Sequence, residues 1–396
     1  MDTTRAMTKA NNLDALLEHE FPVIRQSIYL NHAAVAPWPR RTADAVARFA
    51  DENVARGAAR YAEWTAAEQQ LRRDLAAFLN TIPEDIALLK NTSEALSVVA
   101  HGFPWVAGDN VVSSDEEFPS NRIVWESLRD RGVTLRQVPL AGVPDPEAAL
   151  LAACDGRTRL LTISSVQYGS GLRLDLARLG AGCQARGIAF CVDAIQGLGV
   201  FAHDVQACHI DFLMADGHKW LLGPEGLAVF YCRGAWRERL TLHQHGWHMV
   251  EDYHNYDRKD WTPAATARRF ECGSPNMLGI YALGASLSLL AEVGIAQIES
   301  RVLQRSALLF QAIRTHADLE LFTADRPGRY AGIVTFRHRR TPTPELFQRL
   351  RTGGVICAQR GGNIRFSPHF YTPLEQFDRA LDLVVGWTKP EGRLSD

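Results

Sequence analysis

One lysine is singled out by its position between two structural signals. Lys219 follows the apolar run Phe212–Ala215 and precedes the turn residues Gly223–Pro224. An amine at the end of a buried strand can act as a nucleophile or take up a proton. Taken alone, however, such a lysine is more simply explained as a surface residue. Its value as a candidate catalytic group depends on what other segments place beside it.

Two further segments carry groups that complement a reactive amine. Asp193 ends the apolar run Ala189–Val192, so its carboxylate is expected at the carboxyl edge of a parallel sheet, where α/β folds bind ligands. A carboxylate there can keep the nitrogen of a bound heterocycle protonated. Asn91–Glu94 stands where a strand passes into a helix, and a helix start binds anions. Both also have structural explanations, as a helix N-cap and a capping box.

The elements that would position these groups alternate along the chain. Helical spacing is clear over residues 42–54 and 71–79, and another helix is expected over residues 120–131. Short apolar runs predict buried strands at Ile86–Leu89, Val111–Val112, Leu160–Ser164, Ala189–Val192, Phe212–Ala215 and Leu227–Cys232. Strands alternating with helices favour an α/β fold with a mainly parallel sheet.

The C-terminal part has a different pattern. A long helix with an internal break is predicted from Leu278 to Asp318. Strands at Gly332–Phe336 and Asn363–Phe366 and a helix at Leu374–Trp387 complete a smaller α+β domain. The predicted organisation is therefore a lead-in over residues 1–20, a large domain over residues 21–277 and a small domain over residues 278–396.

Composition excludes several classes of protein. The chain has 396 residues and a formal net charge of -2, with no basic run of the kind that nucleic-acid binders carry. No apolar stretch approaches the roughly 18–20 residues of a membrane span, and the polar segment Met1–Glu20 does not look like a secretory signal. The seven cysteines are odd in number and form no C-x-x-C pair, which favours a reducing, cytoplasmic location.

The stretch from His243 to Phe270 has no clean period and is rich in histidine, tryptophan and tyrosine. Its histidines lack the spacing of metal ligands, so we expect no metal site there. A loop that lines a substrate pocket is the better interpretation, with Trp247 and His248 as candidate specificity residues.

Taken together, the segments resemble the class V aminotransferase family, the cysteine-desulfurase-like branch of fold-type-I enzymes that use pyridoxal 5'-phosphate (PLP). The matching motifs run from Tyr29 to Thr372, nearly the whole chain. The resemblance implies a large domain with a mainly parallel seven-stranded sheet, a smaller α+β C-terminal domain, and PLP as the cofactor. It also implies a homodimer with a shared active site, because the segment Arg269–Asn276 matches one that reaches the phosphate of the neighbouring subunit.

The resemblance assigns a role to each matching position. In the Gly217-His218-Lys219 pattern, Lys219 would be the Schiff-base lysine and general acid/base, and His218 a phosphate ligand. Asp193 would pair with the pyridine nitrogen and Gln196 would contact the ring hydroxyl. The other cofactor-binding positions implied are Thr92, Ser93, Phe118, Tyr168 and Ser274, with Phe118 as the ring-stacking residue. The substrate-binding positions implied are His32, Trp247, Arg360 and Arg365, with Arg365 gripping a carboxylate.

Two positions depart from the family pattern. Asp216 stands where a phosphate-binding serine is usual, and a carboxylate would repel a phosphate, so we expect it to turn away, toward His218. Desulfurases carry the persulfide-forming cysteine in a longer loop, whereas here the loop is short and Cys357 lies before the expected place. Cys357 is interpreted as a small buried residue.

These features predict a PLP-dependent enzyme that acts at Cα of an amino acid or related amine through a carbanion. A lyase (C–S or β-elimination) or an aminotransferase is favoured. The alternatives are an epimerase or racemase, a persulfide-forming cysteine desulfurase, which the short loop disfavours, a metal-dependent hydrolase, and a non-catalytic binding module.

Overall fold

The computed structural model describes residues 13–385 and separates into two compact units, which we describe one at a time. The larger unit comprises Trp38–Tyr168 and Arg173–Ala296. The smaller unit comprises the chain up to Pro37, the short segment Gly169–Leu172, and the chain from Gln297 onward. The division differs from the boundary expected at residue 277, since residues 21–37 belong to the smaller unit and residues 278–296 to the larger. Residues 13–20 of the expected lead-in form a helix, and residues 1–12 lie outside the described residues.

A seven-stranded sheet forms the centre of the larger unit, in the order β2-β8-β7-β6-β5-β3-β4. All neighbours pair in parallel except β8, which is antiparallel to both β2 and β7. The strands are β2 Ile86–Leu89, β3 Asn110–Ser114, β4 Thr134–Val138, β5 Thr158–Ser164, β6 Ala189–Asp193, β7 Phe212–Asp216 and β8 Ala228–Cys232. The predicted mainly parallel α/β sheet is confirmed.

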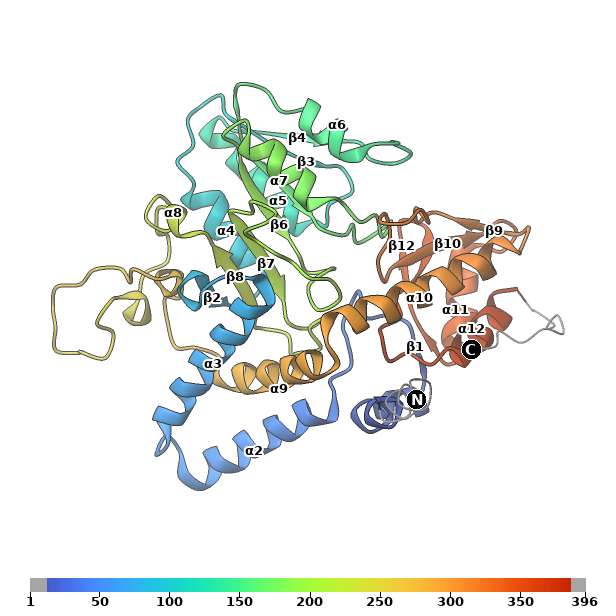
Figure 1. Ribbon diagram of the computed structural model, residues 1–396, viewed down its shortest axis with the longest axis horizontal. Coiled ribbons are helices and arrows are strands. Elements are labelled where there is room, and N and C mark those ends of the chain that lie inside the picture. The colour runs from blue at the N-terminus through green and yellow to red at the C-terminus, as the bar shows by residue number, and fades with distance from the viewer. Residues whose placement is uncertain (1–12, 386–396) are drawn as a thin grey trace, which may run out of the picture. The chain divides into compact units, whose positions relative to one another are not determined.

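The helices of the larger unit are α2 Arg40–Arg56, α3 Tyr61–Leu79, α4 Thr92–Gly102, α5 Ser120–Glu126, α6 Pro146–Ala152, α7 Leu176–Gln184, α8 Gly234–Arg237 and α9 Met277–Val293. They lie around its sheet, except that α2 lies apart from the sheet and packs along α9 (Figure 1). Helices α2 and α3 both pack on α9, whereas α4 packs on β7 and β8. The core strands β2, β3, β6, β7 and β8 are buried along their whole length, and all of them except β3, whose sequence is mostly polar, contain an apolar run of at least four residues.

The smaller unit contains a four-stranded antiparallel sheet and a two-stranded parallel pair. Its elements are β1 Ile28–Tyr29, α10 Ile295–Arg314, β9 Leu319–Leu321, β10 Val334–His338, α11 Thr343–Thr352, β11 Val355–Ile356, β12 Ala358–Arg360, β13 Asn363–Phe366 and α12 Glu375–Val385. Strand β1 pairs with β11, so Ile28 joins the same apolar cluster as Val355 and Phe366. The predicted break in the long helix falls at Gly294, between α9 and α10. Trp387, the predicted end of the last helix, lies outside the described residues.

Among residues 13–385, no single helix has both the length and the apolar composition to cross a membrane. Helices α9 and α10 meet those two criteria only when they are taken together across the break.

Candidate active site

Lys219 lies in a tight turn that follows strand β7. The Lys219 carbonyl accepts a hydrogen bond from Leu222 N at 3.0 Å, and Leu222 has a φ of 61°, in the left-handed region. Ser286 of α9 braces this turn by donating its hydroxyl to the Leu222 carbonyl at 2.8 Å. The lysine side chain is buried, and its Nζ lies 5.7 Å from the centroid of the Phe118 ring. The fold therefore holds the amine in a shielded place instead of exposing it at a strand end.

Asp193 is the last residue of β6, as the sequence predicts, and its side chain is fully buried. Its Oδ1 accepts a hydrogen bond from Ile195 N at 3.0 Å. Burial raises the pKa of this carboxyl to about 7, and the positive charge of Lys219 acts in the opposite direction. A buried carboxylate of this kind is stabilised by a cationic partner, and a protonated ring nitrogen would supply one.

The side-chain amide of Gln196 is oriented by Trp220. The indole Nε1 of Trp220 donates to Gln196 Oε1 at 2.8 Å, and both side chains are buried. An amide nitrogen is a hydrogen-bond donor, so it is the Gln196 atom whose chemistry suits a ring oxygen. Trp220 follows Lys219 directly, but nothing in its local sequence marks it as a positioning residue.

Helix α4 begins at the predicted anion site. Asn91 caps the helix by accepting from Glu94 N at 2.9 Å, and Ser93 Oγ donates to Ser120 Oγ at 2.8 Å. Thr92 and Asp216 form a reciprocal pair, because Thr92 N donates to Asp216 Oδ2 at 3.3 Å and Asp216 N donates to Thr92 Oγ1 at 3.1 Å. The prediction that Asp216 turns away is wrong in part. Asp216 Oδ2 is bonded to the first residue of α4, and Asp216 Oδ1 lies 3.8 Å from His218 Nδ1.

Several polar atoms around this place are buried without a hydrogen-bond partner among the described residues. They are Asp216 Oδ1, His218 Nδ1, Ser165 Oγ and Gln167 Oε1. Buried polar atoms in folded proteins are normally satisfied, so these donors and acceptors beside Asp193 and the start of α4 fit a polar ligand. The residues present fit PLP: His218, Thr92 and Ser93 would hold its phosphate, Asp193 and Gln196 its ring, and Lys219 its aldehyde.

Phe118 and Tyr168 provide aromatic surface for the ring. Their centroids are 5.2 Å apart and their planes are at 84°, an edge-to-face contact. Phe118 keeps 43% of its surface exposed, which leaves its face available for stacking as the sequence predicts.

The predicted substrate-binding arginines lie on neighbouring strands of the smaller unit. Arg365 is opposite Ala358, and Arg360 is opposite Asn363 in the β12–β13 pair. This register puts both arginines on one face of the sheet. Arg365 is buried and Arg360 is exposed.

His32 is fully buried within the same unit. Its Nδ1 lies 2.8 Å from the Ser367 carbonyl and its Nε2 lies 2.6 Å from the Tyr371 hydroxyl. Because a carbonyl only accepts, Nδ1 carries the proton and Nε2 accepts from Tyr371. Burial lowers the pKa of His32 to about 3, so the ring is neutral. Both nitrogens are engaged inside the unit, which favours a structural role over the predicted substrate contact.

Comparison with known proteins decides the family. A model of the family described as aminotransferase class-V matches residues 28–378. The chain belongs to this family. It is thus a PLP-dependent enzyme, and the resemblance inferred from the motifs is confirmed.

Named relatives align over most of the class V chain. A probable cysteine desulfurase of Methanothermobacter thermautotrophicus is 29% identical, covering 93% of this chain and 98% of the relative. A cysteine desulfurase of Klebsiella pneumoniae is 32% identical, covering 80% of each. The solved structure of a C-DES mutant with glycine covalently linked to the PLP cofactor has a TM-score of 0.87 at 22% identity, covering 93% of this chain and 98% of that one. This last likeness confirms the fold.

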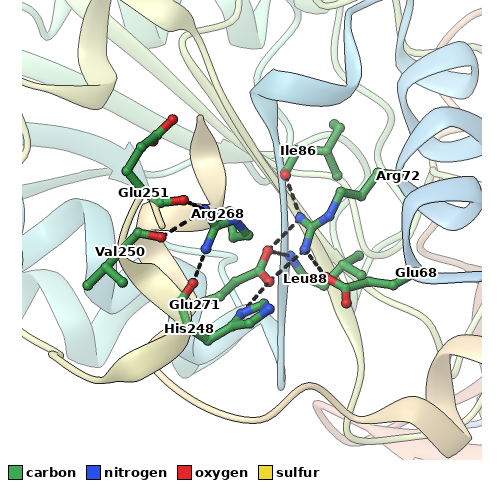
Figure 2. A network of polar contacts seen from close by, with 9 residues as sticks. All are labelled: Glu68, Arg72, Ile86, Leu88, His248, Val250, Glu251, Arg268 and Glu271. Carbon is green, nitrogen blue, oxygen red and sulfur yellow. Dashed lines mark hydrogen bonds and ion pairs between the residues drawn. The ribbon is translucent and has the colours of Figure 1, made fainter. Parts of the chain in front are cut away.

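The class V motif Arg269–Asn276, which contains Ser274, is anchored by a buried ion network (Figure 2). Arg72 of α3 donates to both carboxylate oxygens of Glu271, at 2.5 and 2.6 Å, and to Glu68 at 2.5 Å. Glu271 also accepts from Leu88 N of β2 at 2.7 Å. Ser274 itself lines a pocket of about 260 Å³ together with Cys272. The network fixes the segment before Ser274 to helix α3 and strand β2.

His248 lies in this network and does not itself line the pocket of about 440 Å³ formed by Trp247, Tyr253, Tyr256 and Trp261. Glu68, His248 and Glu271 have ligand atoms within 4.8 Å of one another, a spacing that suits a metal ion. The Arg72 guanidinium already lies between the two carboxylates, as Figure 2 shows. This arrangement gives no support to the metal-dependent hydrolase alternative.

Replacing Arg72 with Met is expected to lower the free energy of unfolding by about 3–5 kcal/mol, because two carboxylates would remain buried without their cation. Urea denaturation measures the loss. Arg73→Met is the matched control, since Arg73 is the next residue of α3, is exposed, and hydrogen-bonds only to Gln70. Equal losses in the two variants would show that the network is not stabilising.

Proposed function

We propose that this enzyme breaks the C–S bond of cysteine or a close analogue. The observation that carries the proposal is the end-to-end match to relatives named cysteine desulfurase. These names favour the desulfurase alternative over the broader elimination or transamination that the sequence favoured. Two buried residues support an amino-acid substrate. In the smaller unit Arg365 suits a carboxylate, and in the larger unit Lys219 suits proton transfer.

Each proposed role follows from the surroundings of the residue. Arg365 binds the substrate carboxylate, and Lys219 Nζ takes the proton from Cα. When bound, PLP supplies an electron sink for the charge left at Cα. Asp193 keeps the ring nitrogen protonated, which maintains that sink, and Gln196 orients the ring through its amide nitrogen.

Whether the sulfur passes to a cysteine of the protein depends on whether that cysteine's thiol is accessible. A protein persulfide requires an accessible thiolate. Cys357 is 6% exposed and belongs to the apolar cluster of the smaller unit, and burial raises its pKa to about 12. These features support the second candidate function, a C–S lyase that releases its sulfur without using Cys357 as the acceptor.

The Cys357→Ala enzyme is expected to keep most of its activity, measured as sulfide and persulfide released from cysteine and cystine. Cys183→Ala is a suitable control, because Cys183 is also buried with a pKa raised to about 12. After incubation with cysteine, mass spectrometry should find no added sulfur on Cys357. Persulfide on Cys357 together with an inactive Cys357→Ala variant would restore the protein-persulfide route. If neither cysteine nor cystine reacts, the C–S cleavage proposal fails.

We also propose a homodimer in which the Ser274 segment completes the site of the neighbouring subunit. The pocket beside Ser274 and the rigid anchor through Glu271 support this role. A cytoplasmic location is proposed as well, because all seven cysteines are free thiols that a reducing compartment would preserve.

A further inference from the structure

Glu117 is a buried carboxylate to which the roles above assign no function. It is 6% exposed and directly precedes the stacking residue Phe118. Burial raises the pKa of its carboxyl, and four hydrogen bonds act in the opposite direction. Burying an ionisable group costs free energy, so a buried carboxylate with this many hydrogen bonds suggests a functional role.

The donors to Glu117 come from the end of strand β5 and from helix α5. Ser164 donates its backbone N–H at 2.8 Å and its hydroxyl at 2.5 Å. Gln167 Nε2 donates at 2.7 Å, and Asn121 Nδ2 donates at 2.8 Å. All of these donors are neutral, and no cation among residues 13–385 is paired with Glu117. Hydrogen bonds from neutral donors favour the ionised form while leaving its negative charge uncompensated.

The position of these donors links Glu117 to Asp193. Ser164 is the register partner of Asp193 between β5 and β6, and Ser165 N donates to the Asp193 carbonyl at 2.9 Å. The charged groups that act on Asp193 are Glu117, Lys219 and Asp216. Glu117 is therefore one of two negative charges beside the carboxylate that faces the cofactor ring.

We propose that Glu117 is a positioning residue that fixes the Ser164–Gln167 turn beside Asp193 and holds a second negative charge behind it. A cation at Asp193 is then stabilised by two carboxylates, and the low polarity of the interior strengthens the interaction with both. The same turn leads into Tyr168, whose ring contacts Phe118, so the hydrogen bonds to Glu117 also hold the aromatic surface in place. The inference rests on the dependence on PLP and is independent of which amino acid is the substrate.

The test is a pH titration of the visible absorbance of the lysine-bound cofactor, without substrate. A negative charge stabilises the protonated forms of the cofactor and its lysine linkage, so its removal favours deprotonation. In Glu117→Gln the midpoint is expected to move to lower pH by about one unit. Glu147→Gln is the matched control, since Glu147 is a fully buried carboxylate that also accepts a backbone N–H, from Asp175, and belongs to a different helix, α6.

A second variant covers the case in which Glu117→Gln loses the cofactor. Gln167→Met keeps the carboxylate and removes one donor, which favours protonation of Glu117 and loss of part of its charge. Its midpoint is expected to move in the same direction by a smaller amount. The proposal is overturned if a variant that retains the cofactor has the same midpoint as the wild type. It is also overturned if Glu147→Gln shifts the midpoint by the same amount. A purely structural role would change cofactor retention without moving the midpoint.

Discussion

Replacing Lys219 with Ala is expected to lower turnover by at least about a thousandfold, because the group that moves the Cα proton is lost. Because Lys219 is buried, another residue of the chain cannot easily take over its function. Its turn is held by the hydrogen bond from Ser286 to the Leu222 carbonyl and by the left-handed conformation of Leu222. Steady-state turnover and the visible absorbance of the bound cofactor measure the effect.

Lys259→Ala is the control for this change, because Lys259 is exposed in the loop that follows η4 Trp247–Met249. It should retain both turnover and the absorbance band. Turnover within tenfold of the wild type in Lys219→Ala would rule out the assigned role.

Asp193→Ala is expected to reduce turnover by about 10²–10³-fold while part of the cofactor stays bound. In the proposed mechanism the carboxylate stabilises the charge that develops during the reaction, whereas the start of helix α4 and Lys219 would retain the cofactor. Cofactor content by absorbance and turnover on the same sample separate these two effects.

Asp211→Asn provides the comparison for Asp193→Ala. Asp211 precedes β7 and is also buried, and it accepts from Phe190 N at 2.9 Å at the opposite end of β6. Its replacement should affect stability more than turnover. Near-normal turnover in Asp193→Ala with the cofactor retained would refute the electron-sink role.

The buried strands of the large unit could be predicted because burial on both faces leaves a continuous apolar run. Strand β4 was not predicted, since it is an edge strand whose residues Thr134–Gln137 are mostly exposed and carry no such run. The expected domain bounds differ from the observed ones for a related reason. Helix α9 packs on α2 and α3, which places residues 278–296 in the larger unit, and β1 places residues 21–37 in the smaller one. Strand β1 pairs with β11 more than 300 residues later, and local periodicity contains no information about so distant a partner.

In the site, too, some residues could be predicted from the local sequence and others depend on contacts between distant segments. Lys219 and Asp193 follow strands, so their place at one sheet edge could be inferred from the order of the elements. Glu117 stands beside Glu116 in the sequence, and only the fold makes one of them buried and the other not. Trp220 and the Arg72–Glu271 pair depend likewise on contacts between segments far apart in the chain.

Borohydride reduction of the purified enzyme, followed by peptide mapping, tests the central claim most directly. Reduction fixes PLP to the amine that carries it, so the label reports the residue without depending on the substrate. We predict a single labelled peptide with the cofactor on Lys219. A label on another lysine, or no label in protein that shows the visible absorbance band, would contradict the account.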